Sequence, residues 1–444
     1  MIVSTQYGDI SGINTAFCDV YLGIPYAAPP MGDLTFKHPV PPEPWDGVFK
    51  ADKGSANPVQ AEGGFHIGNN NLDCLYLNVF VPKGVTGPLP VMVWLYGGAF
   101  SQGGAGAKEP GSSDVHYNLA RFAMETGCIA VTLNYRLNVY GFLNLHALDD
   151  RFDVNNGLYD QIAALRFVKE NIAAFGGDPN NITLFGQSAG GASVLALMTM
   201  PEAKGLFNKA IAQSPCVDHF FTVEESVEFT KRYLRDAGIK TPAELFDLPE
   251  KTVVDANAKY QSSFLIKGDV RCAFSPIIDG KGLPAAPMDT VRQCEMPLLI
   301  GSTTEEINLF IRNIPGFLLP VGALLMQLPV EDGEGSYRQR FSRALTKRVF
   351  VTPQTEMLEG YAGPVWRYEY GYAVPGHEMG CHHCAELPVL FGLNDLFDGA
   401  DDPKSDKVGN TLRRKWKNFA KHGNPGWEPY GKRGFVHPIY DEMC

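Results

Sequence analysis

A serine at the apex of a sharp turn constrains the fold of this chain more than any other feature. The apolar run Ile182–Phe185 predicts a strand, and the alanine- and leucine-rich run Ala189–Met198 predicts a helix. Between them, the glycines of Gly186-Gln187-Ser188-Ala189-Gly190 leave room for a turn that larger residues could not make. Such a turn lifts the serine hydroxyl above the sheet, and the positive end of the following helix points at it. We therefore predict that Ser188 is a nucleophile, rather than part of a chance G-x-S-x-G match in a chain with 47 glycines.

The residues around this turn predict an α/β fold. Val91–Leu95 and Cys128–Leu133 are near-continuous apolar runs, as strands covered on both faces require. Apolar residues recur at helical spacing from Leu158 to Phe175, and strands are also expected at 297–300 and 365–370. This alternation of strand and helix favours a mostly parallel central sheet with helices on both faces.

We expect residues 1–444 to form a single catalytic domain with two insertions. Residues 1–60 predict antiparallel strands followed by loops. Residues 219–270 carry charged amphipathic helices, and residues 307–360 are mixed and contain several prolines. Both stretches interrupt the alternation, so we interpret them as cap insertions above the sheet that would form the wall of a substrate site.

Composition excludes several function classes. The formal net charge of −11 and the pI near 5.4 do not favour binding to nucleic acid or to an anionic membrane surface. The first residues have neither the basic patch nor the apolar stretch of a signal peptide. No run approaches the roughly 18 apolar residues that span a bilayer. The nine cysteines are odd in number and scattered, which fits a reduced cytoplasmic compartment better than a disulfide scaffold.

A serine nucleophile needs hydrogen-bond donors for the negative charge that develops on the substrate carbonyl oxygen. Gly97-Gly98-Ala99 follows the predicted strand that ends near Leu95, and small residues let the backbone approach a substrate closely. The elbow adds the N–H group of Ala189. A plain turn is the alternative interpretation of the two glycines.

The serine also needs a histidine base and a carboxylate that orients it. Glu305 and Glu306 follow the predicted strand at 297–300, where ligands of a parallel sheet bind, and the residues alone do not choose between them. A solvated acidic loop is the alternative for both, and Asp279 is a weaker candidate that resembles a turn residue.

Several histidines in the C-terminal part of the chain could act as the base. His382 and His383 are adjacent, and the further candidates are His377, His422 and His437. Any one of them could instead be a surface histidine or a satisfied core histidine. The string Cys381-His382-His383-Cys384 also suggests a metal, but a C-x-x-C pair without a second ligand pair is a weak zinc signal.

Several motifs together resemble the type B carboxylesterase and cholinesterase family, essentially from end to end. Within that family the chain is most similar to bacterial para-nitrobenzyl-esterase-like enzymes. The motifs that carry the resemblance are Leu22–Pro30, Leu72–Val79, Asn134–Leu137, Phe175–Pro179, Phe185–Ser193 and Trp416–Ala420.

The resemblance implies an α/β-hydrolase fold and assigns each part of a catalytic site. It implies Ser188 as nucleophile, Glu306 as the triad acid and His383 as the base, with no metal or organic cofactor. It also implies that the backbone N–H groups of Gly98, Ala99 and Ala189 form the oxyanion hole. Asp160 and Arg136 match a buried ion pair of the family that serves the scaffold.

The chain departs from the family at several positions. Gln187 stands where many members carry a glutamate, which removes a negative charge beside the site. Ile307 and Cys384 replace usual glycines next to the acid and the base. Secreted members pair a cysteine with the one that matches Cys74, but Pro58-Val59-Gln60 offers no partner, so we expect a free thiol. The stretch between Glu306 and His383 is also short for the family, so we expect a more open site.

The resemblance implies a serine carboxylic-ester hydrolase that cleaves small to medium, mostly uncharged esters through an acyl-enzyme. The partner is a small-molecule ester, with no nucleic acid and no membrane span, and the oligomeric state stays open. Two alternatives remain, a binding protein that kept the fold without activity and a hydrolase of amides or thioesters.

We expect short acyl chains in the substrate. Five phenylalanines could line an apolar pocket or belong to the core: Phe100, Phe220, Phe221, Phe310 and Phe317.

Overall fold

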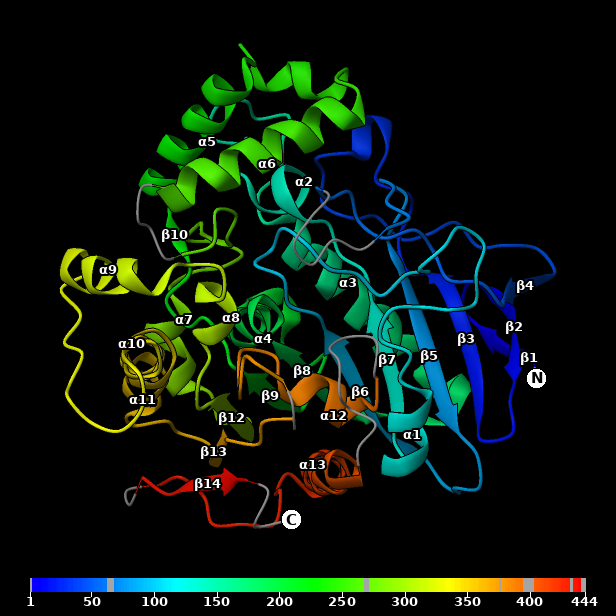
Figure 1. The fold of residues 1–444 in the computed structure, drawn as a ribbon. Coiled ribbons are helices and arrows are strands. Elements are labelled where there is room, and N and C mark those ends of the chain that lie inside the picture. The colour runs from blue at the N-terminus through cyan, green and yellow to red at the C-terminus, as the bar shows by residue number, and fades with distance from the viewer. Residues whose placement is uncertain are drawn as a thin grey trace.

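A long twisted sheet crosses the whole molecule (Figure 1). The computed structural model describes residues 2–61, 68–266, 271–374, 377–393, 403–431 and 434–440. In these ranges the sheet has twelve strands, in the order β1-β2-β3-β5-β7-β6-β8-β9-β12-β13-β14, with β4 paired to β2. The strands are β1 (Ile2–Thr5), β2 (Gly8–Asn14), β3 (Cys18–Pro25), β4 (Val48–Ala51), β5 (Tyr76–Pro82), β6 (Leu89–Leu95), β7 (Ile129–Leu133), β8 (Gly177–Gln187), β9 (Lys209–Gln213), β12 (Leu298–Thr303), β13 (Val365–Tyr370) and β14 (Val436–Ile439).

The pairing changes from antiparallel to parallel at β7. Strands β1, β2, β3, β5 and β7 pair antiparallel in that order. From β7 through β6, β8, β9, β12 and β13 to β14, every pair is parallel. The predictions of an antiparallel N-terminal part and a mostly parallel central sheet are confirmed. Each predicted central strand also lies within or beside an observed one.

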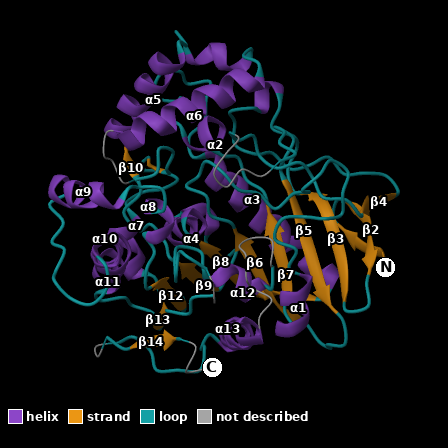
Figure 2. Ribbon diagram, viewed as in Figure 1, coloured by secondary structure: helices purple, strands orange, loops and turns teal. Residues whose placement is uncertain are grey.

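Helices cover both faces of the sheet (Figure 2). On one face α3 (Asn156–Asn171) and α4 (Ala189–Thr199) pack against β8, and on the other α1 (Ala120–Thr126), α12 (Glu386–Phe391) and α13 (Pro403–His422) pack together. The remaining helices of seven residues or more are α5 (Val223–Ala237), α6 (Glu250–Ile266), α9 (Leu319–Leu325), α10 (Tyr337–Thr346) and α11 (Thr352–Leu358). Short helices include α2 (Asn138–Phe142), α7 (Pro287–Thr290) and α8 (Asn308–Ile311), and β10 (Phe221–Thr222) pairs with β11 (Ile277–Ile278) in a small second sheet.

The central strands are apolar throughout because both of their faces are buried. In β6, Val91, Val93 and Leu95 point into the core on one side of the sheet. Met92 and Trp94 point into a second core cluster that includes residues of α1, α12 and α13. Successive side chains of a strand alternate between its faces, so a strand between two helical layers needs an apolar residue at every position.

The expected insertions contain helices that lie outside the sheet. Helix α5 lies in the stretch 219–270, where amphipathic helices were predicted, and it packs against α6 at the top of the view in Figure 1. Helices α8 to α11 lie within residues 307–360. Among the described residues, no helix combines the length and the apolar character needed to cross a bilayer.

A buried ion pair joins the helical layer to the loop after β7. The Arg136 guanidinium donates two hydrogen bonds to the Asp160 carboxylate, from Nε at 2.8 Å and from Nη2 at 2.7 Å. The backbone N–H of Arg136 donates to the same carboxylate, and Nη1 donates to the carbonyl of Thr35 at 3.1 Å. Both side chains are almost completely buried. The pair therefore connects three distant segments, in agreement with a scaffold role.

Replacing Asp160 with alanine should destabilise the protein strongly. The Arg136 guanidinium would remain buried without its counter-ion, which costs about 3–5 kcal/mol. The measurement is the free energy of unfolding from denaturant titration. Asp255→Ala is the matched control, because it breaks an exposed i,i+4 pair with Lys251 and should cost about 0.5 kcal/mol or less. Equal losses for the two variants would contradict this assignment.

Candidate active site

Ser188 lies at the apex of a strained turn between β8 and α4. Its backbone has φ 57° and ψ −121°, a conformation that a non-glycine residue rarely adopts. A Cβ atom on Gly190 would lie 2.1 Å from the carbonyl oxygen of Leu95, so only glycine fits at that position. The strand, sharp turn and helix predicted around the serine are therefore present, and close backbone contact with β6 holds them in place.

Glu306 and His383 are in direct contact. The Nδ1 atom of His383 lies 2.5 Å from Oε2 of Glu306, and both side chains are buried. The other carboxylate oxygen, Oε1, accepts hydrogen bonds at 2.6 Å from the Ser214 hydroxyl and from the backbone N–H of Thr303. With the carboxylate fixed from both sides, the imidazole is held with Nδ1 as donor and the lone pair of Nε2 directed away from Glu306.

Burial and charge act in opposite directions on His383. Burial opposes the charged imidazolium, but the neighbouring Cys384 and Glu306 favour it, and the pKa of His383 is raised well above its ordinary value. An imidazolium at this position is therefore stabilised, which is the property a general base needs after it has taken a proton.

The structure separates the two pairs of neighbouring candidates. Glu305 accepts a hydrogen bond from the Asn308 amide at 3.1 Å and does not contact His383. His382 Nδ1 lies 2.6 Å from the carbonyl oxygen of His383, and burial lowers the pKa of His382 to about 4. Asp279 accepts hydrogen bonds from the backbone N–H groups of Lys281 and Leu283 and forms a turn.

The other histidines have different surroundings. The ring of His377 lies 4.9 Å from that of His382, and the ring of His437 stacks on Trp427 at 4.3 Å. His422 is exposed at the end of α13. Within the described residues, no group of three or more histidine, cysteine, aspartate or glutamate side chains is arranged to hold a metal ion.

The Gln187 side chain contacts the free nitrogen of the imidazole. Its Nε2 atom lies 3.0 Å from Nε2 of His383. In the neutral imidazole, Nδ1–H faces Glu306 and the lone pair on Nε2 accepts from the Gln187 amide. In the described part of the chain, the Ser188 hydroxyl forms no hydrogen bond with His383, and the amide of its neighbour occupies that lone pair. Sequence reasoning identified Gln187 only as a departure from the family and did not foresee this contact.

The loop after β6 lies directly beside Ser188. A Cβ atom on Gly97 would lie 2.9 Å from Cβ of Ser188, and the backbone beyond it has positive φ at Gly98, Ala99 and Phe100. The N–H groups of Ser101 and Gln102 both donate to the carbonyl of Gly98. Among the described residues, the N–H groups of Gly98 and Ala99 donate no hydrogen bond to other protein groups. They are therefore available to an anion near the serine.

Ala189 supplies the third predicted donor. It is the first residue of α4, where backbone N–H groups have no acceptor within the helix. The partial positive charge of the helix N-terminus is also concentrated there. The three predicted oxyanion donors thus belong to two backbone segments that meet at Ser188.

Two aromatic rings flank the imidazole of His383. Phe310 and Phe350 each lie 5.3 Å from it, measured between ring centroids. Phe350 comes from a π-helical turn, Lys347–Val351, and was not among the phenylalanines predicted for the pocket. Of the other expected pocket residues, Phe317 is exposed, and Phe100, Phe220 and Phe221 are buried in the core.

The departures from the family have different structural consequences. Cys384 has φ 73°, in the left-handed region that favours the usual glycine. Ile307 has φ −72°, which any residue adopts without strain. Cys74 is a buried free thiol, as predicted, and the other seven cysteines in the described ranges are also free, whereas Cys444 lies outside those ranges.

A second buried carboxyl lies close to the first. One oxygen of Glu386 accepts a hydrogen bond from the Gln213 amide at 3.0 Å, and the other has no hydrogen-bond partner among the described residues. Burial, assisted by the charge of Glu306, raises the pKa of Glu386 to about 7. Sequence reasoning did not assign a role to this residue.

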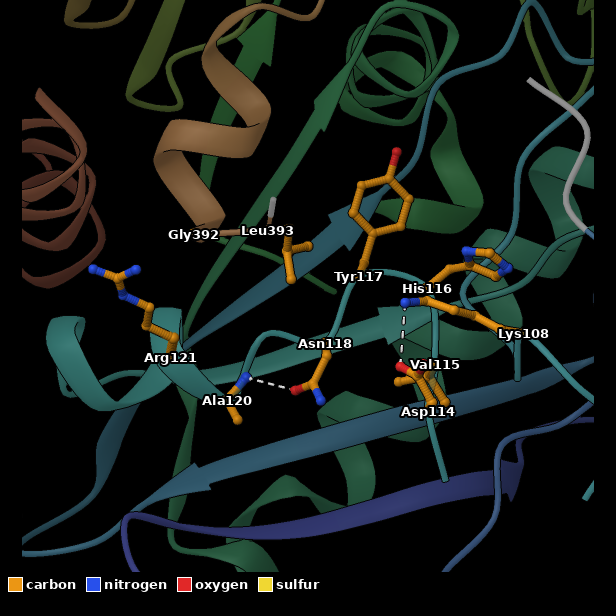
Figure 3. Close-up of a pocket in the computed structure, with 10 residues that line it drawn as sticks. All are labelled: Lys108, Asp114, Val115, His116, Tyr117, Asn118, Ala120, Arg121, Gly392 and Leu393. Atoms are coloured by element: carbon orange, nitrogen blue, oxygen red, sulfur yellow. Dashed lines mark hydrogen bonds and ion pairs between the residues drawn. The ribbon is translucent and has the colours of Figure 1, made fainter. Parts of the chain in front are cut away.

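A cavity of about 480 Å³ lies away from these residues (Figure 3). Its lining includes Tyr117, Leu393, Lys108 and Arg121, and it contains none of Ser188, Glu306 and His383. The charged groups in its lining pair with carboxylates, since Lys108 contacts Asp114 and Arg121 contacts Glu125 and Asp406. The cavity therefore offers no unpaired charge for a ligand.

Comparison with known proteins identifies the family. The model of the carboxylesterase family matches residues 1–318 and 323–434. The chain belongs to the carboxylesterase family. It is 35% identical to a para-nitrobenzyl esterase of Bacillus subtilis, over 96% of this chain and 91% of that protein. It is 30% identical to a fumonisin B1 esterase of Sphingopyxis macrogoltabida, over 98% of this chain and 86% of that protein.

Solved structures agree with this assignment. A structure titled PNB esterase superposes with a TM-score of 0.86 at 33% identity, covering 100% of this chain and 96% of that one. The carboxylesterase therefore has the α/β-hydrolase fold, and it is an ester-hydrolysing enzyme.

Replacing Gln187 with glutamate should shift the pH dependence of the carboxylesterase. A carboxylate near Nε2 of His383 would stabilise the imidazolium and raise its pKa. Because the base must be neutral, the acidic limb of kcat/KM should move up by about one pH unit. The measurement is a kcat/KM profile with a para-nitrophenyl ester. Gln293→Glu, at an exposed position, is the control and should not move that limb. If the acidic limb of the Gln187→Glu profile stays where it is in the wild type, the contact between Gln187 and His383 is contradicted.

Glu386 should make folding stability fall as the pH rises. The unfolded carboxyl loses its proton near its ordinary pKa of 4.5, whereas the folded one keeps it up to about 7. Between these two pKa values folding takes up a proton. The free energy of unfolding therefore declines as the pH rises, by on the order of 3 kcal/mol in total. The decline between pH 5 and pH 8 should be smaller in Glu386→Gln and unchanged in the exposed Glu331→Gln. Parallel curves for all three proteins, measured by denaturant unfolding, would refute this role.

Proposed function

We propose that this carboxylesterase hydrolyses small to medium, mostly uncharged esters with Ser188 as nucleophile, His383 as general base and Glu306 as the orienting acid. The supporting observation is the contact between His383 and Glu306, close to a serine held at the apex of a strained turn. The acid, the base and the serine follow β12, β13 and β8, which lie close together in the parallel part of the sheet. Ligands of such sheets bind beyond the carboxyl ends of the strands.

The reaction begins when the Ser188 hydroxyl replaces the Gln187 amide on Nε2 of His383. This exchange requires rotation of the adjacent Gln187 and Ser188 side chains. His383 then takes the serine proton while the serine oxygen attacks the ester carbonyl, and Glu306 stabilises the imidazolium. The backbone N–H groups of Gly98, Ala99 and Ala189 stabilise the oxyanion.

The intermediate collapses to an acyl-enzyme as His383 gives its proton to the leaving alcohol. Water then attacks the acyl group, with His383 again as the base, and the carboxylate product leaves. Every step uses side chains and backbone groups of this chain, and we propose no metal or organic cofactor.

The surroundings of His383 support an uncharged substrate. The rings of Phe310 and Phe350 present apolar surface beside the imidazole. Gln187 is neutral where many family members carry a glutamate, so no carboxylate at that position attracts a cation. The relatives named para-nitrobenzyl esterase and fumonisin B1 esterase differ in the esters their names describe, so the family alone does not define the substrate.

We further propose that the enzyme acts in the cytoplasm of a bacterium, as a single catalytic domain with cap insertions at about 219–270 and 307–360. The free cysteines of the described ranges support a reducing compartment. The similarity to the Bacillus subtilis enzyme supports a bacterial source.

Replacing Ser188 with alanine should lower kcat for a para-nitrophenyl ester by about a million-fold. The alanine removes the nucleophile but leaves the fold, so the thermal melting temperature should change little. Ser113→Ala, at an exposed position, is the control and should retain full activity. A loss of only a few-fold in Ser188→Ala would show that another group is the nucleophile.

A covalent label provides an independent test of the same assignment. A fluorophosphonate should modify Ser188 in the native protein and should not modify Ser188→Ala. A binding protein that has the fold but no hydrolase activity should not be modified. Rates on a panel of matched esters, amides and thioesters would then decide which bond the site prefers.

A further inference from the structure

Large apolar side chains are exposed along one short stretch next to the candidate active site. We call this stretch, residues 310–325, the α8–α9 surface. Leu325 is 79% exposed, Leu324 78% and Phe317 77%. In Figure 1, α9 lies at the outer edge of the molecule. The exposed large apolar side chains of the surface are Phe310, Ile314, Phe317, Leu318, Val321, Leu324 and Leu325.

The α8–α9 surface is the outer face of a segment that is apolar on both sides. Its inner face includes Ile311, Leu319 and Ala323, which are buried in a separate core cluster with residues of α10. The exposed residues recur about every three to four positions, as one face of a helix requires. Residues 313–330 contain no charged side chain. The inner face accounts for the fold of this segment, and the outer face needs another explanation.

Basic side chains lie at both ends of this apolar surface. Arg338 donates to the carbonyls of Ile311 and Ile314, and Arg348 donates to the carbonyl of Met326, so they lie at its two ends. Residues 312–348 contain six basic and three acidic residues, a net charge of +3 in a chain of net charge −11. The charge of the whole chain predicted no attraction to anionic membranes, but this region has the opposite sign.

We propose that the α8–α9 surface docks on the surface of an anionic lipid bilayer. An apolar face bordered by arginine and lysine matches the boundary between acyl chains and negatively charged headgroups. Helix α9 has only seven residues, so it fits the plane of the interface and not a membrane span. A second copy of the chain is a poorer partner, because a symmetric dimer would place the same basic groups against each other.

Docking in this way would place the lipid phase beside the catalytic residues. Phe310 belongs to the exposed surface, and its ring lies 5.3 Å from that of His383. The exposed apolar surface thus begins beside the imidazole. An ester dissolved in the bilayer could then reach the site without crossing water, so the surface would select esters that partition into lipid.

The experiment is co-sedimentation of the protein with vesicles of phosphatidylglycerol or of phosphatidylcholine. We expect binding to phosphatidylglycerol vesicles that weakens at high salt, and much weaker binding to phosphatidylcholine. The double variant Leu324→Ser with Leu325→Ser should bind at least about tenfold more weakly. Arg312→Gln with Lys347→Gln should weaken binding by about tenfold or more without affecting the apolar face.

Matched controls separate docking from misfolding and from catalysis. Phe17→Ser removes another exposed aromatic ring, 66% exposed in the turn before β3, and should bind like the wild type. Each variant should keep the wild-type melting temperature to within a few degrees, since the altered side chains are exposed. Ser188→Ala should bind vesicles as well as the wild type does, so failure of docking and failure of the proposed nucleophile are distinguishable.

Three results would overturn the proposal. One is equal sedimentation of the wild type and the double leucine variant. Another is binding to phosphatidylcholine as strong as that to phosphatidylglycerol. The third is a stable dimer by light scattering that the double leucine variant abolishes, together with no vesicle binding, which would assign the surface to a second copy of the chain.

Discussion

The candidate site depends on a contact between two peptide backbones with no side chain between them. At Gly190 the first turn of α4 lies against the carbonyl of Leu95, the last residue of β6. This approach holds the elbow against the strand whose following loop carries the candidate oxyanion donors. The unusual backbone angles at Ser188 persist because the packed strands on both sides determine them, as is common for strained residues at functional sites. The positions of the candidate nucleophile and of the candidate oxyanion donors therefore depend on each other.

The buried polar groups behind His383 form a connected set. Glu306 is held by Ser214 and by the backbone of Thr303, so its carboxylate cannot rotate away from the imidazole. Nearby, the Trp416 indole donates to Gln213, whose amide donates to Glu386. In a dry interior such hydrogen bonds are strong, and an unpaired carboxylate is costly. Burial, with one carboxyl oxygen left without a hydrogen-bond partner among the described residues, is therefore what raises the pKa of Glu386 to about 7.

The sequence predicted those features that follow from burial and close backbone contact. The apolar runs at β6 and β7 indicated strands covered on both faces, and the glycines around Ser188 indicated an elbow. The residues alone could not choose between Glu305 and Glu306, because that choice depends on which carboxyl faces a histidine 77 positions away.

Other features were beyond prediction because they depend on three-dimensional packing. The contact of Gln187 with the imidazole and the position of Phe350 in a π-helical turn follow no sequence period. Hydropathy likewise does not tell which apolar side of the segment at 310–325 the core covers. The sequence analysis predicts short acyl chains, whereas the exposed apolar face of that segment points to esters that partition into lipid.

Helix α13 has a consequence for how the enzyme is made. It covers one face of the sheet with Leu412, Trp416 and Phe419, yet it follows every strand except β14 in the chain. While a ribosome synthesises the protein from its N-terminus, the sheet can begin to assemble long before its cover exists. Until α13 emerges, the nascent polypeptide exposes Trp94 and its neighbours to solvent. This interval is when chaperones would have to shield the incomplete molecule from aggregation.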